Sequence, residues 1–119
     1  MIDGWVTQLR KGLLEYCVLT VLRRGESYGY EIVQALQRIA ALAVSESTVY
    51  PILSRLRAEK CLRTRDVPSA FGPPRRYFAL TPAGRLRLAE MHAYLAMLDD
   101  ALDQLQQPPP KKDEYESAG

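Results

Sequence analysis

The chain has 119 residues, of which 47% are hydrophobic and 25% are charged, and its formal net charge is +2. This length suits one domain, and the composition is that of a globular protein, which excludes wholesale disorder. Two cysteines cannot build a disulfide scaffold, so we expect a reducing compartment such as the cytoplasm. The longest apolar stretch, residues 13–22, is too short to span a bilayer.

The small net charge conceals an uneven distribution along the chain. Residues 47–87 carry nine basic and two acidic side chains, whereas residues 88–107 carry four acidic side chains and no Lys or Arg. The local net charges are therefore +7 and −4. A basic segment of this kind suggests a nucleic-acid partner, with a well-solvated protein face as the alternative.

Helical spacing of apolar residues from about residue 7 to residue 24 predicts a first helix. Apolar residues occupy almost every face of this helix, which is typical of a helix at the centre of a domain. Gly25 follows in the position that glycine favours after a helix C-terminus. Ser27 is then a candidate N-cap for a second helix over residues 28–41.

A third helix is expected over residues 46–60, where an apolar stripe runs from Val49 to Leu56. Pro51 requires this helix to begin near residues 45–47, since proline is tolerated only near the first turn. The opposite face carries hydroxyls, a tyrosine and an arginine, which suit contacts with phosphates and base edges. The candidate DNA-binding residues on this helix are Ser47, Thr48, Tyr50, Pro51, Ser54 and Arg55.

Two strand-like segments follow, at residues 62–67 and 76–80. Three prolines and one glycine separate them, which predicts a hairpin with an irregular tip. We expect Arg75 and Arg76 to bind phosphate from this hairpin, with a packing role as the alternative for Arg76. Tyr28, at the start of the second helix, is a further candidate for phosphate contact.

Thr81 and Pro82 are typical of a helix cap and first turn, and they predict a fourth helix over residues 82–106. Its apolar residues step alternately by three and four, as in a coiled-coil seam, and we therefore favour a homodimer. The seam consists of Leu88, Met91, Leu95, Leu98, Leu102 and Leu105. Just over two heptads are too few for a free coiled coil, so packing within the chain is the alternative.

The order helix, helix, helix, hairpin, helix predicts a mostly α fold with a small β-hairpin, a winged helix-turn-helix with an added C-terminal helix. We expect residues 1–81 to form the DNA-binding domain, residues 82–107 the dimerisation helix and residues 108–119 a disordered tail. In such folds the third helix enters the major groove, and the hairpin contacts the backbone or minor groove. Both elements lie in the basic segment.

Four stretches of sequence form a recognisable set: GLLE at 12–15, YGYEI at 28–32, STVYPILSRL at 47–56 and PRRYFALTPAG at 74–84. They resemble the PadR-like bacterial transcriptional regulators, in the short-C-terminal subgroup. The resemblance implies a dimeric repressor whose C-terminal helix dimerises against the first helix. It also implies a small aromatic or hydrophobic effector near that interface. One departure is Lys60-Cys61, where the family usually has a glycine that closes the third helix.

Several of the candidate site residues have a second, purely structural interpretation. Tyr50 could cover the edge of the core, and Arg55 could form an ion pair within the chain. Trp5, Leu9, Tyr16 and Tyr94 could line an effector pocket between the first and fourth helices, although core or interface packing explains them equally well.

The sequence offers little to support catalysis or a cofactor. It has no glycine-rich phosphate loop and no metal-ligand cluster around His92, so we expect no enzyme, cofactor or metal. We expect Cys17 to be a core residue and Cys61 to be partly exposed. The alternative function is a winged-helix module that binds a protein partner and not DNA.

Overall fold

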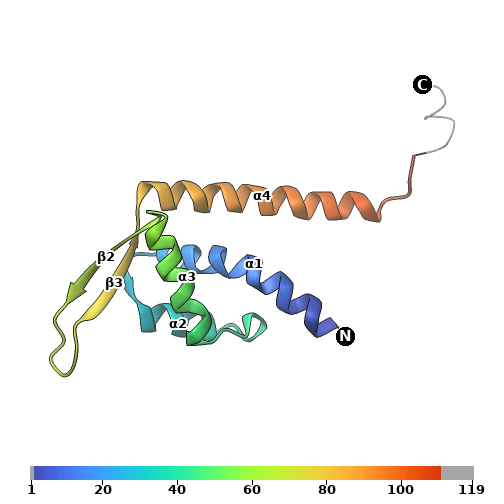
Figure 1. The fold of residues 1–119 in the computed structure, drawn as a ribbon. Helices are drawn as coiled ribbons and strands as arrows, with labels where there is room; N and C mark the ends of the chain where they lie inside the picture. Colours follow the sequence, from blue (N-terminus) through green and yellow to red (C-terminus); the bar gives the residue numbers. More distant parts are fainter. Residues whose placement is uncertain (1, 111–119) are drawn as a thin grey trace.

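The computed structural model describes residues 2–110, and its helices and strands are arranged as a winged helix with a long C-terminal helix (Figure 1). The helices are α1 (Ile2–Arg23), α2 (Gly29–Gln37), α3 (Glu46–Ala58) and α4 (Pro82–Gln106), with a short 3-10 helix, η1, at Ala40–Leu42. The strands are β1 (Ser27–Tyr28), β2 (Leu62–Val67) and β3 (Arg75–Leu80). They form an antiparallel sheet in the order β1-β3-β2, which has one strand more than the predicted hairpin.

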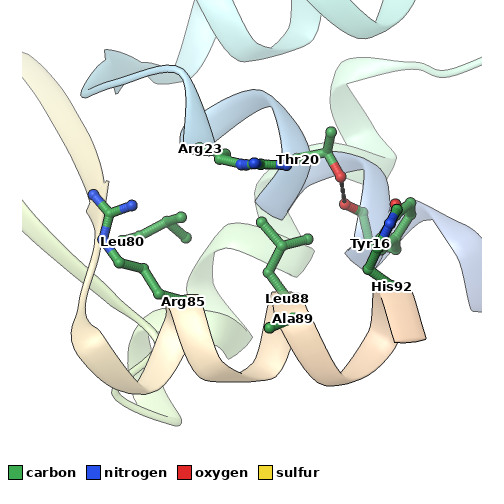
Figure 2. A pocket seen from close by; sticks show the side chains of 8 residues that line it. All are labelled: Tyr16, Thr20, Arg23, Leu80, Arg85, Leu88, Ala89 and His92. Carbon is green, nitrogen blue, oxygen red and sulfur yellow. Dashed lines mark hydrogen bonds between the residues drawn. The ribbon is translucent and has the colours of Figure 1, made fainter. Parts of the chain in front are cut away.

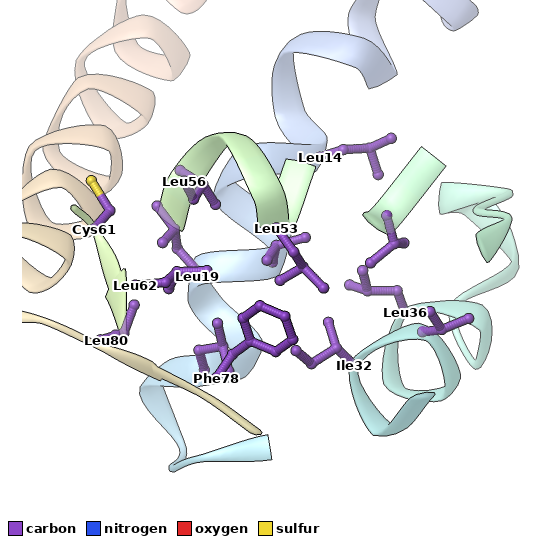
Figure 3. Packing of buried hydrophobic residues seen from close by; sticks show 14 of the residues in the cluster. Leu14, Leu19, Ile32, Leu36, Leu53, Leu56, Cys61, Leu62, Phe78 and Leu80 are labelled. Carbon is purple, nitrogen blue, oxygen red and sulfur yellow. The ribbon is translucent and has the colours of Figure 1, made fainter. Parts of the chain in front are cut away.

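The core lies around α1, as the all-round apolar pattern of this helix predicts. Val18 and Leu19 of α1 are completely buried, and Ile32 of α2 and Leu56 of α3 pack in the same cluster. Phe78 of β3 closes the cluster from the side of the sheet (Figure 3). Burial of these side chains removes their apolar surface from water and packs α2 and α3 against α1.

The start of α1 and the limits of α2 differ from the sequence prediction. α1 begins at Ile2, five residues early, and the Thr7 hydroxyl donates to the Asp3 carbonyl within the helix at 2.9 Å. Ser27 is not the N-cap of α2, because it pairs in the sheet with Phe78. α2 also ends at Gln37 and not at residue 41, and η1 follows.

Tyr28 is the residue that caps α2. The Glu31 carboxylate accepts the Tyr28 N–H at 3.1 Å, so a side chain three positions into the helix satisfies this backbone donor. Tyr28 also pairs with Tyr77 across the sheet. The strand β1 therefore ties the start of α2 directly to β3.

The end of α3 and the start of α4 meet at one junction. Lys60 has a left-handed backbone (φ +64°), and the N–H groups of Lys60 and Cys61 donate to carbonyls of the last helical turn, both at 2.9 Å. The Cys61 carbonyl in turn accepts the Thr81 N–H at 3.0 Å. Thr81 caps α4 as predicted, accepting the Gly84 N–H at 3.1 Å.

α4 runs beside α1 and then continues past the body of the domain (Figure 1). Along the predicted seam the exposed fraction is 8% at Leu88, 40% at Leu98, 52% at Leu102 and 78% at Leu105. Residues 108–110 have no regular structure, and the rest of the predicted tail lies outside the described residues. No helix between residues 2 and 110 has the length and apolar character needed to cross a membrane.

Candidate nucleic-acid interface

The outer face of α3 carries the residues predicted to contact DNA. Ser47, Thr48, Pro51 and Ser54 are all exposed, while Val49 and its neighbours on the inner face are buried. The hydroxyl of Ser45, the N-cap residue, makes no capping bond; it lies 2.9 Å from the Ser47 hydroxyl. The first turn of α3 therefore presents a cluster of hydroxyls and backbone N–H groups that no side chain caps.

Five of the nine predicted DNA-binding residues line one groove. The groove has a volume of about 530 Å³ and lies between the start of α2, the face of α3 and the hairpin. The five residues are Tyr28, Tyr50, Ser54, Arg75 and Arg76. They come from β1, α3 and β3, and the fold brings them together beside the exposed face of α3.

The ring of Tyr50 lies against Gly29, the first residue of α2. A Cβ at position 29 would be 2.6 Å from the Tyr50 ring, so only glycine leaves this space. Tyr50 remains 41% exposed, and so it does not belong to the core. Partial burial and the nearby Glu46 raise the pKa of the phenol, which keeps it protonated and able to donate a hydrogen bond.

A cluster of arginines and tyrosines joins the hairpin to β1. The guanidinium of Arg75 lies 4.6 Å from the centre of the Tyr28 ring, and Tyr28 contacts Tyr77 at 5.6 Å between ring centres. Arg65 lies 5.4 Å from the centre of the Tyr77 ring on β3. Neither Tyr77 nor Arg65 is predicted as a site residue from the sequence; the register of β2 and β3 places these two residues opposite each other.

Two arginines of the hairpin form ion pairs. Arg65 makes two bonds with the Glu26 carboxylate, at 2.8 and 2.5 Å, and these bonds hold the pKa of Glu26 below its usual range. Arg76 lies 3.1 Å from Asp66, its cross-strand neighbour. Both pairs are exposed, so each adds little stability and can exchange for a phosphate.

Arg55 forms the intramolecular ion pair that the sequence allowed as an alternative. Its guanidinium lies 3.6 Å from the Glu15 carboxylate, although the side chain is still 55% exposed. Glu15 also accepts a bond from Arg87 of α4 at 3.1 Å, and Arg87 lies 2.7 Å from Glu59. This network joins α1, α3 and α4, and it places Arg55 outside the groove that holds Tyr50.

The residues predicted for an effector pocket do not all come together. Tyr16 and Tyr94 line a hollow of about 390 Å³ between α1 and α4, together with Leu95. Trp5 and Leu9 are 63% and 46% exposed, and they do not line this hollow.

Tyr16 also lines a second hollow between α1 and α4 (Figure 2). It has a volume of about 360 Å³, and a hydrogen bond of 2.9 Å joins the Tyr16 hydroxyl to Nδ1 of His92 at its edge. Arg23 and Arg85 also line it, and Leu80 and Leu88 supply apolar surface. Neither arginine is predicted as a site residue from the sequence, because the two are distant along the chain and meet only through the packing of α4 on α1.

Neither cysteine has the environment of a reactive thiol. Cys61 is 2% exposed and not partly exposed as predicted, because the turn after α3 directs its side chain into the core. Cys17 packs against the core, and burial raises the pKa of its thiol, which disfavours the reactive thiolate. Between residues 2 and 110, no group of three potential metal ligands is present.

Comparison with known proteins finds similarity to one family of transcriptional regulators. Residues 18–90 match the model of the transcriptional regulator PadR-like family. A PadR-like transcription factor from Bacteroides fragilis is 38% identical, with a TM-score of 0.74, and the match covers 87% of this chain and 99% of that one. A PadR family regulator from Eggerthella lenta is 29% identical, with a TM-score of 0.80 and coverage of 91% and 94%.

The fold is also similar to that of Bacillus subtilis PadR, whose structure was solved in complex with operator DNA. The two chains are 24% identical with a TM-score of 0.60, and the match covers 84% of this chain but 50% of that one. This likeness concerns the fold alone.

Proposed function

The chain belongs to the PadR-like family of transcriptional regulators, and we propose that it is a homodimeric repressor that binds operator DNA and acts in the bacterial cytoplasm. The observation that carries the proposal is the groove that brings Tyr28, Tyr50, Ser54, Arg75 and Arg76 beside the exposed face of α3. Four of these five residues, all except Tyr28, lie in the segment with a net charge of +7. Cationic groups on one surface neutralise the phosphates of a DNA backbone, and hydroxyl groups donate hydrogen bonds to the phosphate oxygens.

Each element has a defined part in this proposal. α3 enters the major groove, whose width admits a helix, and Ser47, Thr48, Pro51 and Ser54 face the base edges. Arg75 and Arg76 of the hairpin hold phosphates. Tyr28 and Tyr50 line the groove between these two elements and donate hydrogen bonds to the backbone.

The exposed seam of α4 supports a second copy of the chain as the partner of this helix. Leu98, Leu102 and Leu105 are between 40% and 78% exposed, and Trp5 and Leu9 add exposed apolar surface on α1. Leu88 is 8% exposed and Met91 packs against the same core of its own chain, so the proposed interface begins after these two residues, near Leu95. A dimer of this kind reads an inverted repeat with half-sites about 34 Å apart.

We further propose that a small aromatic or hydrophobic effector releases the repressor from DNA. The two hollows lined by Tyr16 have volumes within the range of small-molecule sites. A ligand in either hollow contacts both α1 and α4. It therefore changes the angle between the dimerisation helix and the domain that carries α3, and with it the spacing of the two recognition helices.

The ion pairs of Arg55, Arg65 and Arg76 favour a second candidate, a winged-helix module that binds a protein partner. These pairs lower the positive charge that is free for phosphates. A protein-binding module predicts a folded chain without affinity for duplex DNA.

A titration with duplex DNA separates the two candidates. The probe is the region upstream of the protein's own coding sequence, with a shuffled duplex of equal length as control, each at two salt concentrations. A repressor binds the native duplex more tightly, and its affinity falls steeply as salt rises. A folded protein without salt-sensitive affinity for either duplex would instead support the protein-binding module.

A further inference from the structure

Phe71 lies in the loop between β2 and β3, and its side chain is 96% exposed. It is the most exposed large hydrophobic side chain among residues 2–110. The next in rank, Leu105 and Met97, lie on α4, close to the seam that the proposed dimer uses. The hairpin instead projects away from the helices, with this loop at its far end (Figure 1). Phe71 therefore belongs neither to the core nor to the proposed dimer surface.

Prolines flank the tip of the loop on both sides. Pro68, Pro73 and Pro74 fix their own φ angles, and Gly72 adopts a left-handed backbone (φ +115°) directly after Phe71. The three prolines lower the entropy that the ends of the loop lose when its tip is held by a partner. They also separate Phe71 from the paired residues of β2 and β3.

Charge is arranged around Phe71 in a way that suits the minor groove. Residues 68–74 contain no charged side chain, whereas the strands behind them carry four arginines and a single acidic residue, Asp66, which pairs with Arg76. The four arginines are Arg63, Arg65, Arg75 and Arg76. Phosphates border the minor groove on both sides, so an uncharged tip between basic strands can enter the groove while the arginines contact its rims.

We propose that Phe71 is an apolar wedge that enters the minor groove beside the major groove occupied by α3 and opens one base step. Phenylalanine side chains are among those that minor-groove proteins insert between bases. The wedge favours a flexible pyrimidine–purine step, and it gives specificity at a position that α3 does not reach. This inference rests on the proposed function, since it needs the chain to bind duplex DNA.

Substitution of Phe71 tests the wedge. The variants F71A and F71L are titrated with the upstream duplex by fluorescence anisotropy at two salt concentrations, with A70S as the control in the same loop. We expect F71A to weaken binding by about tenfold or more, F71L by less, and A70S hardly at all, since the apolar side chain is removed only in the first. The salt dependence of F71A should equal that of the native chain, because an apolar contact releases no counterions.

A binding constant of F71A within about twofold of the native value would overturn the wedge and leave the proposed function standing. A native chain that binds no duplex would overturn both. A lower salt dependence in F71A would also count against the wedge, because it would mean that the loop only positions the arginines.

A fluorescent probe reports insertion directly. Trp5 is the sole tryptophan of the chain, so the double variant W5F/F71W carries its only indole at the tip of the hairpin. Stacking against a base should quench its emission when the upstream duplex is added, while Trp5 in the native chain should show no change. Unchanged emission from the double variant in the DNA-bound state would contradict insertion.

Discussion

Gly84 lies against the carbonyl group of Cys61, so closely that no side chain fits between them. A Cβ at position 84 would be 2.1 Å from the Cys61 oxygen and 3.0 Å from its carbon. The same oxygen accepts the Thr81 N–H at 3.0 Å, and therefore it cannot move away without breaking that bond. The first turn of α4 is thus fixed to the turn that ends α3.

We predict that G84A destabilises the fold by about 2–4 kcal/mol, because the backbone of α4 or of residue 61 must shift to admit a methyl group. Urea denaturation followed by circular dichroism measures the change. G4A is the control, since nothing lies within 4 Å of a Cβ at Gly4 in α1. Equal midpoints for the two variants would mean that the close approach at Gly84 does not constrain the junction.

Substitution of Lys60 by glycine is expected to stabilise the fold. Its φ of +64° is strained for a residue with a side chain, and it occupies the position where glycine commonly ends a helix. We expect K60G to raise the free energy of unfolding by about 1 kcal/mol, because glycine adopts this backbone without steric cost. Thermal and urea melts of the purified variant measure this gain.

K60A is the matched variant for this prediction. Alanine removes the charge and the long side chain but keeps the strained φ, so its stability should stay close to that of the native chain. If K60A gains as much as K60G, the stabilisation comes from removal of the lysine charge in the basic segment and not from relief of strain.

The parts of the fold that follow from local chemistry could be predicted from the sequence. The cap at Thr81, the bounds of α4 and the buried stripe of α3 depend on residues close together in the chain, and all three agree with the structure. The strand β1 has only two residues, too few to show alternation, and its pairing with β3 forms only in the tertiary fold. Local pattern alone therefore favours a cap at Ser27.

The candidate site was predictable in its parts but not in its arrangement. The spacing of residues on α3 gives the exposed face directly. The contact of Arg75 with Tyr28 joins residues 47 positions apart, and the ion pair of Arg55 with Glu15 joins two helices. Such contacts depend on how elements pack, which a periodic pattern does not encode.

The contact between Gly29 and Tyr50 gives a prediction for the proposed interface. G29A pushes the Tyr50 ring out of its place, because the added Cβ would lie 2.6 Å from it. The ring is exposed enough to move, so we expect a small decrease in stability, about 1 kcal/mol. The affinity for the upstream duplex should fall by about fivefold to tenfold, the equivalent of one hydrogen bond. Anisotropy titrations and thermal melts of the same samples separate the two effects.

Y50F is the companion variant, since it keeps the ring and removes only the hydroxyl group. A decrease of affinity in both variants indicates that the phenol contacts DNA. A decrease in G29A alone indicates that the groove between α2 and α3 has changed shape. Native affinity in both variants would remove Tyr50 from the interface.

The arginines of the hairpin should control the salt dependence of binding. We expect R75A/R76A to reduce the slope of log K against log salt by about 0.9 for each phosphate that is no longer neutralised, or nearly 2 in total. R75K/R76K should retain most of the slope, because lysine still neutralises phosphate. Titrations at four or more salt concentrations give the slopes, and an unchanged slope in the alanine variant would exclude the hairpin from phosphate binding.

The exposed seam of α4 allows the dimer to be tested without damage to the protomer. Leu98 and Leu102 are 40% and 52% exposed, so aspartate at both positions leaves the core of the single chain intact. Leu95 suits this purpose less well, because it lies partly buried against α1. We expect L98D/L102D to remain folded by circular dichroism and to sediment as a monomer, since two carboxylates in an apolar interface must lose their hydration.

Ala96 is an exposed position of α4 outside the seam, and A96D is therefore the control for added charge. This variant should sediment like the native chain. The monomeric variant should also bind the upstream duplex about 100-fold or more weakly, because its two half-sites are no longer occupied by linked domains. If L98D/L102D stays a dimer and keeps native affinity, the second copy binds to a surface other than the seam. The part of α4 that continues past the body of the domain then binds a different partner.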